Sequence, residues 1–228
     1  MTMKIWHLFH SGVLVETESV QLFFDVITDI DTLIHPQKKL YFFVSHGHSD
    51  HFSMKILKSF KDKAQFILSD EAVIREAFID CDQTLFVKPN EVHETLPFKI
   101  STYDSTDLGV SFLIELDQKT LFHSGDLNWW HWENATQEVQ ADEARQFKEI
   151  VDSIQVDHID IAFIPVDPRL KDAYNLSAAY FLSEKHLNYL IPIHFNEDYE
   201  ITERLYSDLK NDRIIQVKAK HTMVLTLE

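Results

Sequence analysis

The sequence of 228 residues predicts an α/β fold in which two β-sheets pack together and helices lie outside them. Each half of the chain begins with consecutive strand-like segments and then alternates strands with helices. Polar residues of the kinds that bind metals follow directly after several buried strands, where α/β folds tend to place function. No linker rich in proline or glycine interrupts the chain, so we expect a single domain over residues 1–228.

The first half of the chain is rich in strand-like segments. KIWHLF (4–9) alternates in polarity, whereas LYFFVS (40–45) is a continuous apolar run of the kind found in buried strands. The segment 53–61 has helical spacing, with Ser53 or Asp50 as its candidate N-cap. Strands are predicted at 4–9, 13–17, 20–25, 40–45 and 64–69, and helices at 53–61 and 70–78.

The second half of the chain repeats this order. A long helix is predicted over 136–154, and later helices alternate with apolar runs. One of these runs, DIAFIPVD (160–167), is typical of a buried strand. Strands are predicted at 98–104, 109–116, 120–126, 160–167, 189–195, 214–218 and 222–227, and helices at 136–154, 177–187 and 198–210.

Charge and composition exclude several classes of function. The formal net charge is −16, from 21 basic and 37 acidic residues, and the chain has no basic patch of the kind that grips nucleic acid. The acidic balance also disfavours anionic membranes, and no apolar run approaches the roughly 20 residues of a membrane span. We therefore expect a small-molecule substrate, with no nucleic acid and no membrane as partner. The sequence carries no signal for an oligomeric state.

Cysteine content and the first residues indicate a cellular compartment. The single cysteine, Cys81, excludes an internal disulfide. The start, MTMKIWHLFHSG, lacks the basic region and the apolar stretch of a secretory signal. Both features are typical of a cytoplasmic protein, which is the location we expect.

The stretch SHGHSDHF, residues 45–52, concentrates four side chains that can bind metal. His46 and His48 lie two residues apart, so a short extended backbone can direct both rings to one side. Asp50 and His51 follow a turn and can point to a second position nearby. Imidazole and carboxylate together suit Zn²⁺, Mn²⁺ or Fe²⁺. The alternative, four polar residues that merely solvate a loop, is disfavoured by their place directly after a buried strand.

This stretch resembles the metal-binding signature of the metallo-β-lactamase fold superfamily, and the resemblance continues in order along nearly the whole chain. HSGVLVE and FFD near the start are similar to the opening of its poorly characterised metal-dependent hydrolases, which include relatives of ascorbate-phosphate lactonase. HSGD (123–126) resembles the motif whose aspartate bridges two metals, and IPIHF (191–195) resembles the final histidine motif. The resemblance implies a four-layer αββα sandwich of two mixed β-sheets, with the site at one edge between the sheets.

The resemblance also implies a set of metal ligands. They are His46, His48, Asp50, His51, Asp126 and His194. In this assignment His46 and His48 bind the first metal, Asp126 bridges the two metals, and the other three residues bind the second. The implied cofactor is a divalent metal, most simply Zn²⁺ with Mn²⁺ or Fe²⁺ as alternatives, at one or two ions per chain.

The expected function is that of a metal-dependent hydrolase. Two metals about 3.5–4 Å apart can hold a hydroxide at neutral pH and polarise an electrophilic oxygen of the substrate. Such a metal-bound hydroxide would cleave an ester, lactone or phosphoester-type bond of a small molecule, and Asp50 could alternatively orient the attacking water as a base. A degenerate protein of the same fold, which binds metal or ligand without turnover, is the alternative. A di-iron redox centre is a third interpretation.

One ligand that the resemblance leads us to expect is missing. The superfamily usually supplies a third histidine to the first metal, but the place where it is expected reads YDSTDLG (103–109). Asp107 or Asp104 could replace the imidazole and would favour Mn²⁺ or Fe²⁺. Otherwise the first site is weak, or His10 or His123 reaches it from elsewhere in the chain.

Further side chains are expected around the metals. His10 follows a predicted strand, and His123 precedes the bridging aspartate by three residues, so each could orient a metal ligand through a hydrogen bond. A plain turn residue and a core residue are the respective alternatives. Asp167 and Arg169, after another buried strand, are expected to form a structural ion pair, although the arginine could also meet an anionic substrate group.

The segment NWWHW (128–132) follows Asp126 directly. Trp129, Trp130 and Trp132 could form an aromatic wall for a substrate. A tryptophan-rich loop that packs on the sandwich is the alternative interpretation.

Overall fold

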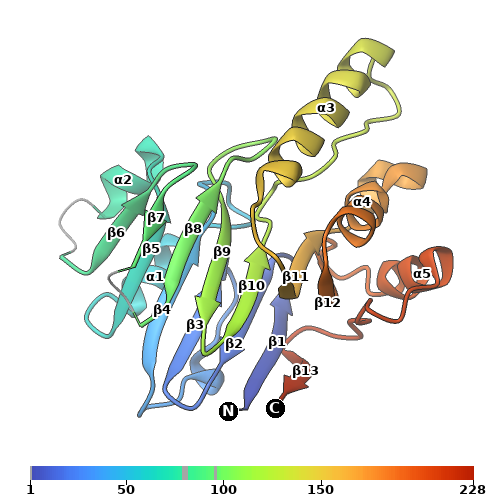
Figure 1. Cartoon of the computed structure of the whole chain (residues 1–228). Coiled ribbons are helices and arrows are strands. Elements are labelled where there is room, and N and C mark those ends of the chain that lie inside the picture. Colours follow the sequence, from blue (N-terminus) through green and yellow to red (C-terminus); the bar gives the residue numbers. More distant parts are fainter. Residues whose placement is uncertain (1, 79–81, 95–96) are drawn as a thin grey trace.

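The computed structural model describes residues 2–78, 82–94 and 97–228, so Cys81 lies outside the described residues. These residues form two β-sheets that face each other, with helices on the outer sides (Figure 1). In the part of the chain that is described, the first sheet has seven strands in the order β13-β1-β2-β3-β4-β5-β6. The second sheet has six described strands in the order β12-β11-β10-β9-β8-β7.

The first sheet consists of β1 (Met3–Phe9), β2 (Gly12–Glu16), β3 (Val20–Phe24), β4 (Lys39–Val44), β5 (Ala64–Ser69), β6 (Thr84–Val87) and β13 (Thr222–Leu227). The second consists of β7 (Val92–His93), β8 (Lys99–Tyr103), β9 (Ser111–Leu116), β10 (Lys119–His123), β11 (Ile159–Pro165) and β12 (Leu187–Ile193). The α-helices are α1 (Met54–Ser59), α2 (Ala72–Phe78), α3 (Gln137–Ser153), α4 (Leu176–Glu184) and α5 (Glu200–Leu209). Two short 3-10 helices are η1 (Asp31–Leu33) and η2 (Pro168–Ala173).

Strand direction brings the loops that carry the motifs to one edge of the sandwich. In the first sheet, β1, β3, β4 and β5 run in the same direction, because β2 is antiparallel to both β1 and β3. In the second sheet, β8, β10, β11 and β12 likewise share one direction. The carboxyl ends of parallel strands lie at the same edge of a sheet, so the loops that follow these strands gather there.

Alternation within the strands separates two hydrophobic layers. In β4, Phe42 packs in one cluster with Leu57 of α1 and Ile74 of α2, on the outer face of the first sheet. The next residue, Phe43, points the opposite way and contacts Phe112 of β9, with ring centroids 5.3 Å apart. One strand therefore contributes both to the layer under the helices and to the layer between the sheets.

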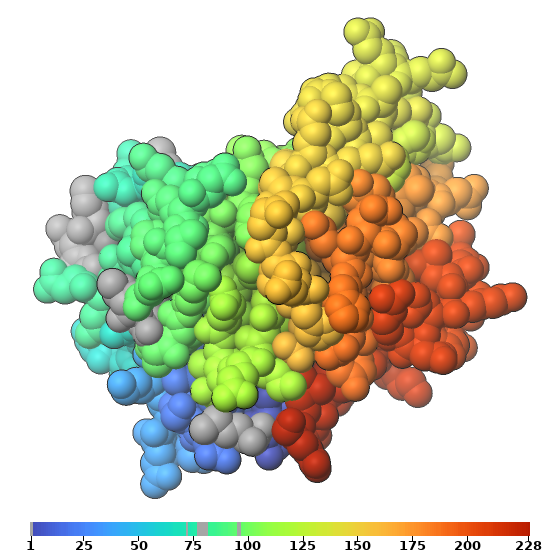
Figure 2. All heavy atoms as spheres, viewed as in Figure 1, coloured from blue at the N-terminus to red at the C-terminus, as the bar shows by residue number. Residues whose placement is uncertain are grey.

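The remaining helices belong to the second sheet. Phe181 of α4 packs on Phe122 of β10 with ring centroids 5.3 Å apart, and Phe147 of α3 lies against the same phenylalanine of α4. Figure 1 shows α3, α4 and α5 on this side, and Figure 2 shows the α3 segment projecting beyond the body of the sandwich. The predicted four-layer αββα sandwich of mixed sheets is confirmed. Among the described residues, none of the helices combines the length and apolar character needed to cross a membrane.

Most predicted elements lie within a few residues of the observed ones. Ser53, and not Asp50, caps α1 by accepting a hydrogen bond from the Ile56 backbone N–H. The strand predicted at 214–218 is wrong: in this segment only Ile214 forms an isolated bridge, with Leu190 of β12. The short strands β6 and β7 were not predicted, because strands of four and two residues are too brief to show a periodicity.

Candidate metal centre

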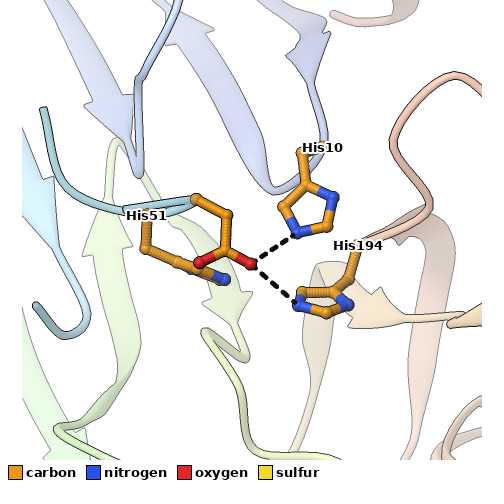
Figure 3. Close-up of side chains that lie close together, drawn as sticks. His10, His51 and His194 are labelled. Carbon is orange, nitrogen blue, oxygen red and sulfur yellow. Dashed lines mark ion pairs between the residues drawn. The ribbon is translucent and has the colours of Figure 1, made fainter. Parts of the chain in front are cut away.

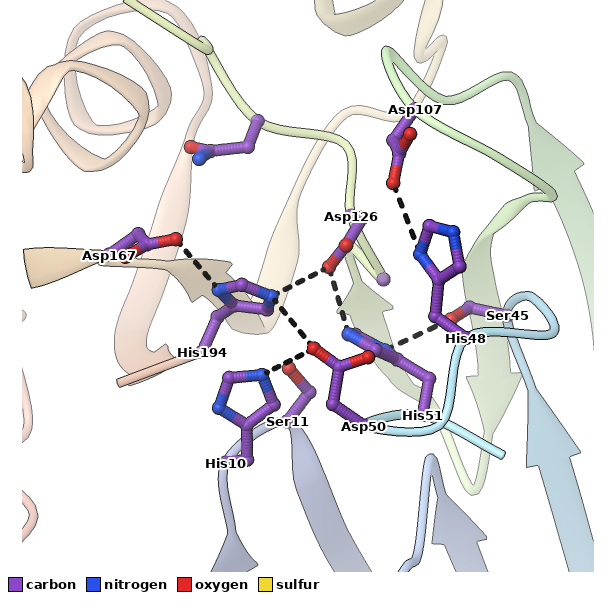
Figure 4. Close-up of polar contacts among 12 residues, drawn as sticks. His10, Ser11, Ser45, His48, Asp50, His51, Asp107, Asp126, Asp167 and His194 are labelled. Atoms are coloured by element: carbon purple, nitrogen blue, oxygen red, sulfur yellow. Dashed lines mark hydrogen bonds and ion pairs between the residues drawn. The ribbon is translucent and has the colours of Figure 1, made fainter. Parts of the chain in front are cut away.

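Loops from both sheets meet at their shared edge, and Figure 4 shows polar side chains that these loops bring together. From the first sheet come the residues that follow β1, β3 and β4, and from the second come those that follow β8, β10 and β12. The residues they bring together are His10, Asp25, His46, His48, Asp50, His51, Asp107, Asp126 and His194. All six metal ligands implied by the sequence resemblance are among them, with Asp107 as well.

The first cluster of candidate ligands contains His46, His48, Asp107 and Asp126, whose ligand atoms lie within 4.8 Å of one another. The Nδ1 atom of His48 lies 3.0 Å from His46 Nε2 and 3.4 Å from Asp107 Oδ2. Asp126 Oδ2 is 3.6 Å from His46 Nε2. The structure thus places Asp107, the suggested replacement for the missing histidine, beside the two histidines of the first site. Its role as a ligand stays a prediction.

The second cluster contains His10, Asp50, His51 and His194 (Figure 3). Asp50 Oδ2 lies 3.4 Å from His10 Nε2 and 3.9 Å from His194 Nε2. Asp126 reaches this cluster too, because its Oδ1 atom is 3.0 Å from His51 Nε2 and 3.2 Å from His194 Nε2. Asp126 therefore stands between the two clusters, with one carboxylate oxygen directed to each.

The facing atoms of these side chains are better placed to bind a metal than to form hydrogen bonds with one another. Among the residues that the structure describes, His51 Nε2, His194 Nε2 and Asp126 Oδ1 are buried and make no hydrogen bond of acceptable geometry, although the distances between them are short. Buried polar atoms are otherwise nearly always satisfied. Lone pairs of nitrogen and oxygen that converge in this way match the ligands that Zn²⁺, Mn²⁺ and Fe²⁺ take from histidine and aspartate.

Electrostatics point to the same need for positive charge. Burial alone would lower the pKa of His51, but the carboxylates of Asp25 and Asp126 outweigh it and raise this pKa to about 10. Burial would raise the pKa of Asp126, yet His51 and His194 bring it well below its usual range. Without a metal, a proton on His51 thus supplies the positive charge that the carboxylates favour, and a divalent cation can replace it.

A buried carboxylate that the sequence interpretation did not single out lies behind the clusters. Asp25 follows β3 and accepts hydrogen bonds from the Ser45 backbone N–H at 2.8 Å and from Ser45 Oγ at 2.6 Å. Its Oδ2 atom also lies 2.7 Å from His51 Nδ1. Since a carboxylate only accepts, Nδ1 of His51 carries a proton, and Nε2, which faces Asp126, is the nitrogen that can give up its proton to a metal.

The same network sets the tautomer of His46. Ser45 Oγ gives its only proton to Asp25, so it must accept at its 3.0 Å contact with His46 Nδ1. The Nε2 atom of His46 is then free to bind a metal. Asp167 lies on the Nδ1 side of His194, with Oδ2 3.2 Å from Nδ1, although these two atoms make no hydrogen bond of acceptable geometry.

Strained backbone holds several of these residues. His10, Asp25 and His194 have φ values of 54°, 45° and 66°, in the left-handed region that residues other than glycine rarely adopt. Each follows directly on the end of a strand or lies one residue past it. Non-glycine residues in this region cost on the order of 1–3 kcal/mol and gather at functional sites.

Two glycines allow the loops to approach one another closely. Gly109 has φ +71°, and a Cβ atom there would lie 1.9 Å from the Ser45 carbonyl oxygen. Gly125 has φ +54°, and its Cβ would lie 2.7 Å from Ser45 Cβ. Both glycines thus let the loops of Asp107 and Asp126 rest against the start of the histidine motif.

The other predicted residues divide between the site and its surroundings. His10 lies in the second cluster and does not reach the first. His123 lies in neither cluster: its Nδ1 accepts a hydrogen bond from the Gly125 backbone N–H at 3.2 Å, and its Nε2 donates to the Ser11 carbonyl at 3.0 Å. It therefore supports the Asp126 loop from behind.

An open pocket of about 310 Å³ lies over the clusters. Its lining residues are His48, Asp50, Thr106, Asp107, Asp126, Trp130, Trp132, Glu143, Arg169 and His194. Trp130 and Trp132 stack with ring centroids 5.7 Å apart and form an aromatic side of the pocket. Trp129 turns away and packs on Phe147 of α3. Two tryptophans of the loop thus face the pocket, and the third packs on the sandwich.

The expected ion pair of Asp167 and Arg169 is present. Arg169 Nε donates to Asp167 Oδ2 at 2.8 Å, and its side chain is 57% exposed at the pocket rim. Burial would raise the pKa of Asp167, but His194 and Arg169 together lower it to about 2. The Asp167 carboxylate therefore lies behind His194, and the Arg169 guanidinium faces the pocket.

Known proteins resemble this chain in structure. No family model matches the sequence, and no curated protein matches it. Igni18, a novel metallo hydrolase from the archaeon Ignicoccus hospitalis, is 16% identical with a TM-score of 0.68, over 100% of this chain and 99% of its own. YhfI from Bacillus subtilis, a metallo-β-lactamase fold protein, is 13% identical with a TM-score of 0.63, over 100% and 99%.

A third similar structure carries a different chemistry. CmlA from Streptomyces venezuelae, a diiron β-hydroxylase, is 10% identical with a TM-score of 0.67, and the match covers 99% of this chain and 54% of CmlA. Identities this low are informative about architecture and not about activity. Together with the two mixed sheets and their outer helices, the likeness to YhfI over the whole chain shows that this chain has the metallo-β-lactamase fold.

Proposed function

We propose that the protein is a metal-dependent hydrolase that acts on a small molecule with an ester, lactone or phosphoester-type bond. The observation that carries this proposal is Asp126, which stands between two clusters of histidine and aspartate at the floor of a pocket. Two metal sites that share a carboxylate are the usual arrangement of hydrolytic two-metal centres. Igni18, which is named a metallo hydrolase, has the same architecture over its whole length, so this architecture is compatible with the reaction class.

Within this proposal, His46, His48 and Asp107 hold one metal, and Asp50, His51 and His194 hold the other, with Asp126 shared. When bound, such metals lower the pKa of water and polarise a substrate oxygen. The chain itself supplies orientation: Asp25 is hydrogen-bonded to His51 Nδ1, and Asp167 lies 3.2 Å from His194 Nδ1. Both rings then present Nε2 to the centre.

Asp50 is the residue we propose as base. Its side chain is 44% exposed and lines the pocket, while one oxygen is directed to His10 and His194. The neighbouring His10 ring is the largest of the influences that lower the pKa of Asp50. An ionised carboxylate at the wall of the pocket can accept a hydrogen bond from a water molecule and align it for attack.

The pocket suits a small substrate of mixed character. Its volume of about 310 Å³ lies at the lower end of the range for ligand sites. The Trp130 and Trp132 rings offer an apolar surface, and Arg169 offers a cation on the same rim. Asp107 and Glu143 line the pocket as well, so an anionic group would be directed to Arg169 and to bound metal.

The donor set favours Zn²⁺ for the histidine-rich second cluster. In the first cluster, Asp107 in place of an imidazole makes the ligands harder, which favours Mn²⁺ or Fe²⁺. A redox function of iron at this centre is the second candidate, because the ligand set accommodates iron and the similar CmlA is named a diiron enzyme.

Metal-loaded protein assayed against a panel of substrates tests the proposal. Protein loaded with Zn²⁺, Mn²⁺ or Fe²⁺ is incubated with chromogenic esters, lactones, phosphomonoesters and phosphodiesters. We expect hydrolysis of at least one class, lost with chelator and restored by metal. Asp126→Asn should lower kcat/KM by about 100-fold or more, and the exposed Asp62→Asn should leave it unchanged.

Two results would contradict the proposal. Metal-loaded protein that hydrolyses none of these classes would favour a binding protein without turnover. Oxygen consumption by the iron-loaded protein with a reductant, in the absence of hydrolysis, would favour the redox alternative.

A further inference from the structure

His10 stands among the candidate ligands of the second cluster, yet its hydrogen bonds differ from those of its neighbours. The Asn196 backbone N–H points at His10 Nδ1 and lies 3.1 Å from it. His10 Nε2 faces the cluster and is buried without a hydrogen bond of acceptable geometry, 3.4 Å from Asp50 Oδ2. Distance alone would therefore make His10 a further ligand of the second metal, beside Asp50, His51, His194 and the shared Asp126.

The hydrogen bond from Asn196 decides the tautomer of His10. A backbone N–H can only donate, so His10 Nδ1 must carry a lone pair. The single proton of the neutral imidazole is then on Nε2, the atom that faces Asp50. An Nε2–H group has no lone pair to offer a metal. Metal binding at Nε2 would move the proton to Nδ1, where it would face the Asn196 N–H and cost a buried hydrogen bond.

The two adjacent histidines have the opposite arrangement. His51 Nδ1 faces the carboxylate of Asp25 at 2.7 Å, and His194 Nδ1 faces that of Asp167 at 3.2 Å. A carboxylate on the Nδ1 side favours a proton there, so Nε2 is the nitrogen that can lose its proton and bind a metal. In the second cluster, His51 and His194 are thus prepared as ligands, whereas His10 is prepared as a donor.

The backbone around His10 makes this arrangement rigid. His10 has φ 54°, and its carbonyl oxygen accepts a hydrogen bond from the His194 backbone N–H at 3.0 Å. The Asn196 N–H that fixes the ring comes from the same segment after β12. The segment after β12 therefore carries His194 and also fixes the tautomer of His10. The His10 ring cannot rotate freely to exchange the positions of its two nitrogens.

From this geometry we infer that His10 is a positioning residue and not a metal ligand: its Nε2–H donates to Asp50 Oδ2 and orients that carboxylate. A buried donor requires an acceptor, and Asp50 Oδ2 is within reach of a modest movement of the side chain. Holding Oδ2 by a hydrogen bond leaves Oδ1 to face the pocket. The role in turnover rests on the proposed hydrolase function, whereas the tautomer and the ligand set do not.

Two substitutions of His10 distinguish a positioning residue from a metal ligand. His10→Gln can place an amide N–H near the former Nε2 position and so keeps the donor. His10→Asn is shorter: its carbonyl oxygen can still accept from Asn196, but it cannot reach Asp50. We expect both variants to bind as many metal ions per chain as the wild type. In turnover, the glutamine variant should stay within about 10-fold of wild-type kcat, while the asparagine variant should lose about 10- to 100-fold in kcat with little change in KM.

Nitrogen NMR of the imidazole rings provides a readout that does not depend on activity. In ¹⁵N-labelled protein loaded with Zn²⁺, we expect His10 to be the neutral Nε2–H tautomer, with a bare Nδ1 that is not bound to metal. We expect His51 and His194 to be protonated on Nδ1 and bound to metal through Nε2. His35→Gln, at an exposed histidine, is the matched control and should leave metal content and these signals unchanged.

Loss of one metal ion in both His10 variants, or an Nδ1-protonated His10 with Nε2 on the metal, would overturn the inference. If His10 had a structural role alone, both variants would lose stability, and His10→Gln and His10→Asn would have the same kcat. That result would also overturn the inference. If no substrate is hydrolysed by the wild type, the proposed function fails, while metal content and the NMR tautomer still decide whether His10 is a ligand.

Discussion

His51 Nδ1 lies 2.7 Å from Asp25 Oδ2, and both side chains are completely or almost completely buried. This contact joins the end of β3 to the histidine motif that follows β4, two adjacent parallel strands. Asp25 also receives both donors of Ser45. One carboxylate therefore fixes the position of the loop and orients the ring of a candidate metal ligand, so the fold and the proposed chemistry of the site depend on the same residue.

Asp25→Asn should weaken metal binding at the second cluster. The amide keeps the shape of the side chain but cannot accept from His51 Nδ1, Ser45 N and Ser45 Oγ together, and it removes the negative charge behind His51. We expect metal affinity to fall about 10- to 100-fold, as measured by competition with a chromophoric chelator. Asp62→Asn, at an exposed aspartate, is the control. Unchanged affinity in Asp25→Asn would show that this carboxylate does not tune the ligand.

Gly109→Ala should destabilise the fold strongly. The new Cβ would lie 1.9 Å from the Ser45 carbonyl oxygen, and φ is +71°. We expect a loss of about 2–4 kcal/mol in the free energy of unfolding, measured by urea titration. Gly47→Ala is the comparison, because its Cβ would meet the side chains of Val73 and Glu71, which can move, and we expect a loss of about 1 kcal/mol or less. Equal effects of the two substitutions would contradict the close packing of the loops.

His7 should make the metal-free protein sensitive to acid. Burial lowers its pKa from 6.5 to about 4 in the folded state. Between these values the unfolded chain binds more protons, so the free energy of unfolding rises with pH, and the contribution of His7 is lost as pH falls from about 6.5 towards 4. The shift corresponds to about 3 kcal/mol.

Urea titrations of chelator-treated protein between about pH 4 and pH 7 measure this effect. His7→Gln removes the titrating group. The free energy of unfolding of this variant should therefore fall less between about pH 7 and pH 4 than that of the wild type, even if the two differ at neutral pH. His35→Gln, at an exposed histidine, should keep the wild-type slope. Parallel slopes for the wild type and His7→Gln would mean that His7 is not held neutral by burial.

The sequence predicted the fold where the chain shows strong local patterns. The continuous apolar run that became β4 and the long amphipathic segment of α3 were both recognisable, and Thr136 begins that helix as its N-cap. The apolar residues of the segment 214–218 led to a wrong prediction. They lie beside β12, where Ile214 forms a single bridge with Leu190, and they do not form a strand. Apolar composition alone does not distinguish these two outcomes.

The spacing of residues indicates only the local part of the site, and Asp126 and His194 were predicted from the family resemblance. The histidines and the aspartate between residues 46 and 51 are close in the chain, so their spacing is visible in the sequence. Asp25 and Asp167 are single carboxylates after strands, and only the sheet order reveals that they lie behind His51 and His194. The tautomer of His10 depends on the backbone N–H of Asn196, which lies after β12 and 186 residues away in sequence, so no spacing could indicate it.

Metal content by elemental mass spectrometry tests the central claim, a centre of two metals that share Asp126, most directly. Wild-type protein, Asp107→Ala and His51→Ala are each loaded with Zn²⁺, Mn²⁺ or Fe²⁺ and freed of excess ion. We expect about two ions per chain in the wild type and about one in each variant, because each substitution removes a ligand from a different cluster. One ion or fewer in the wild type, or no loss in either variant, would contradict the two-metal centre.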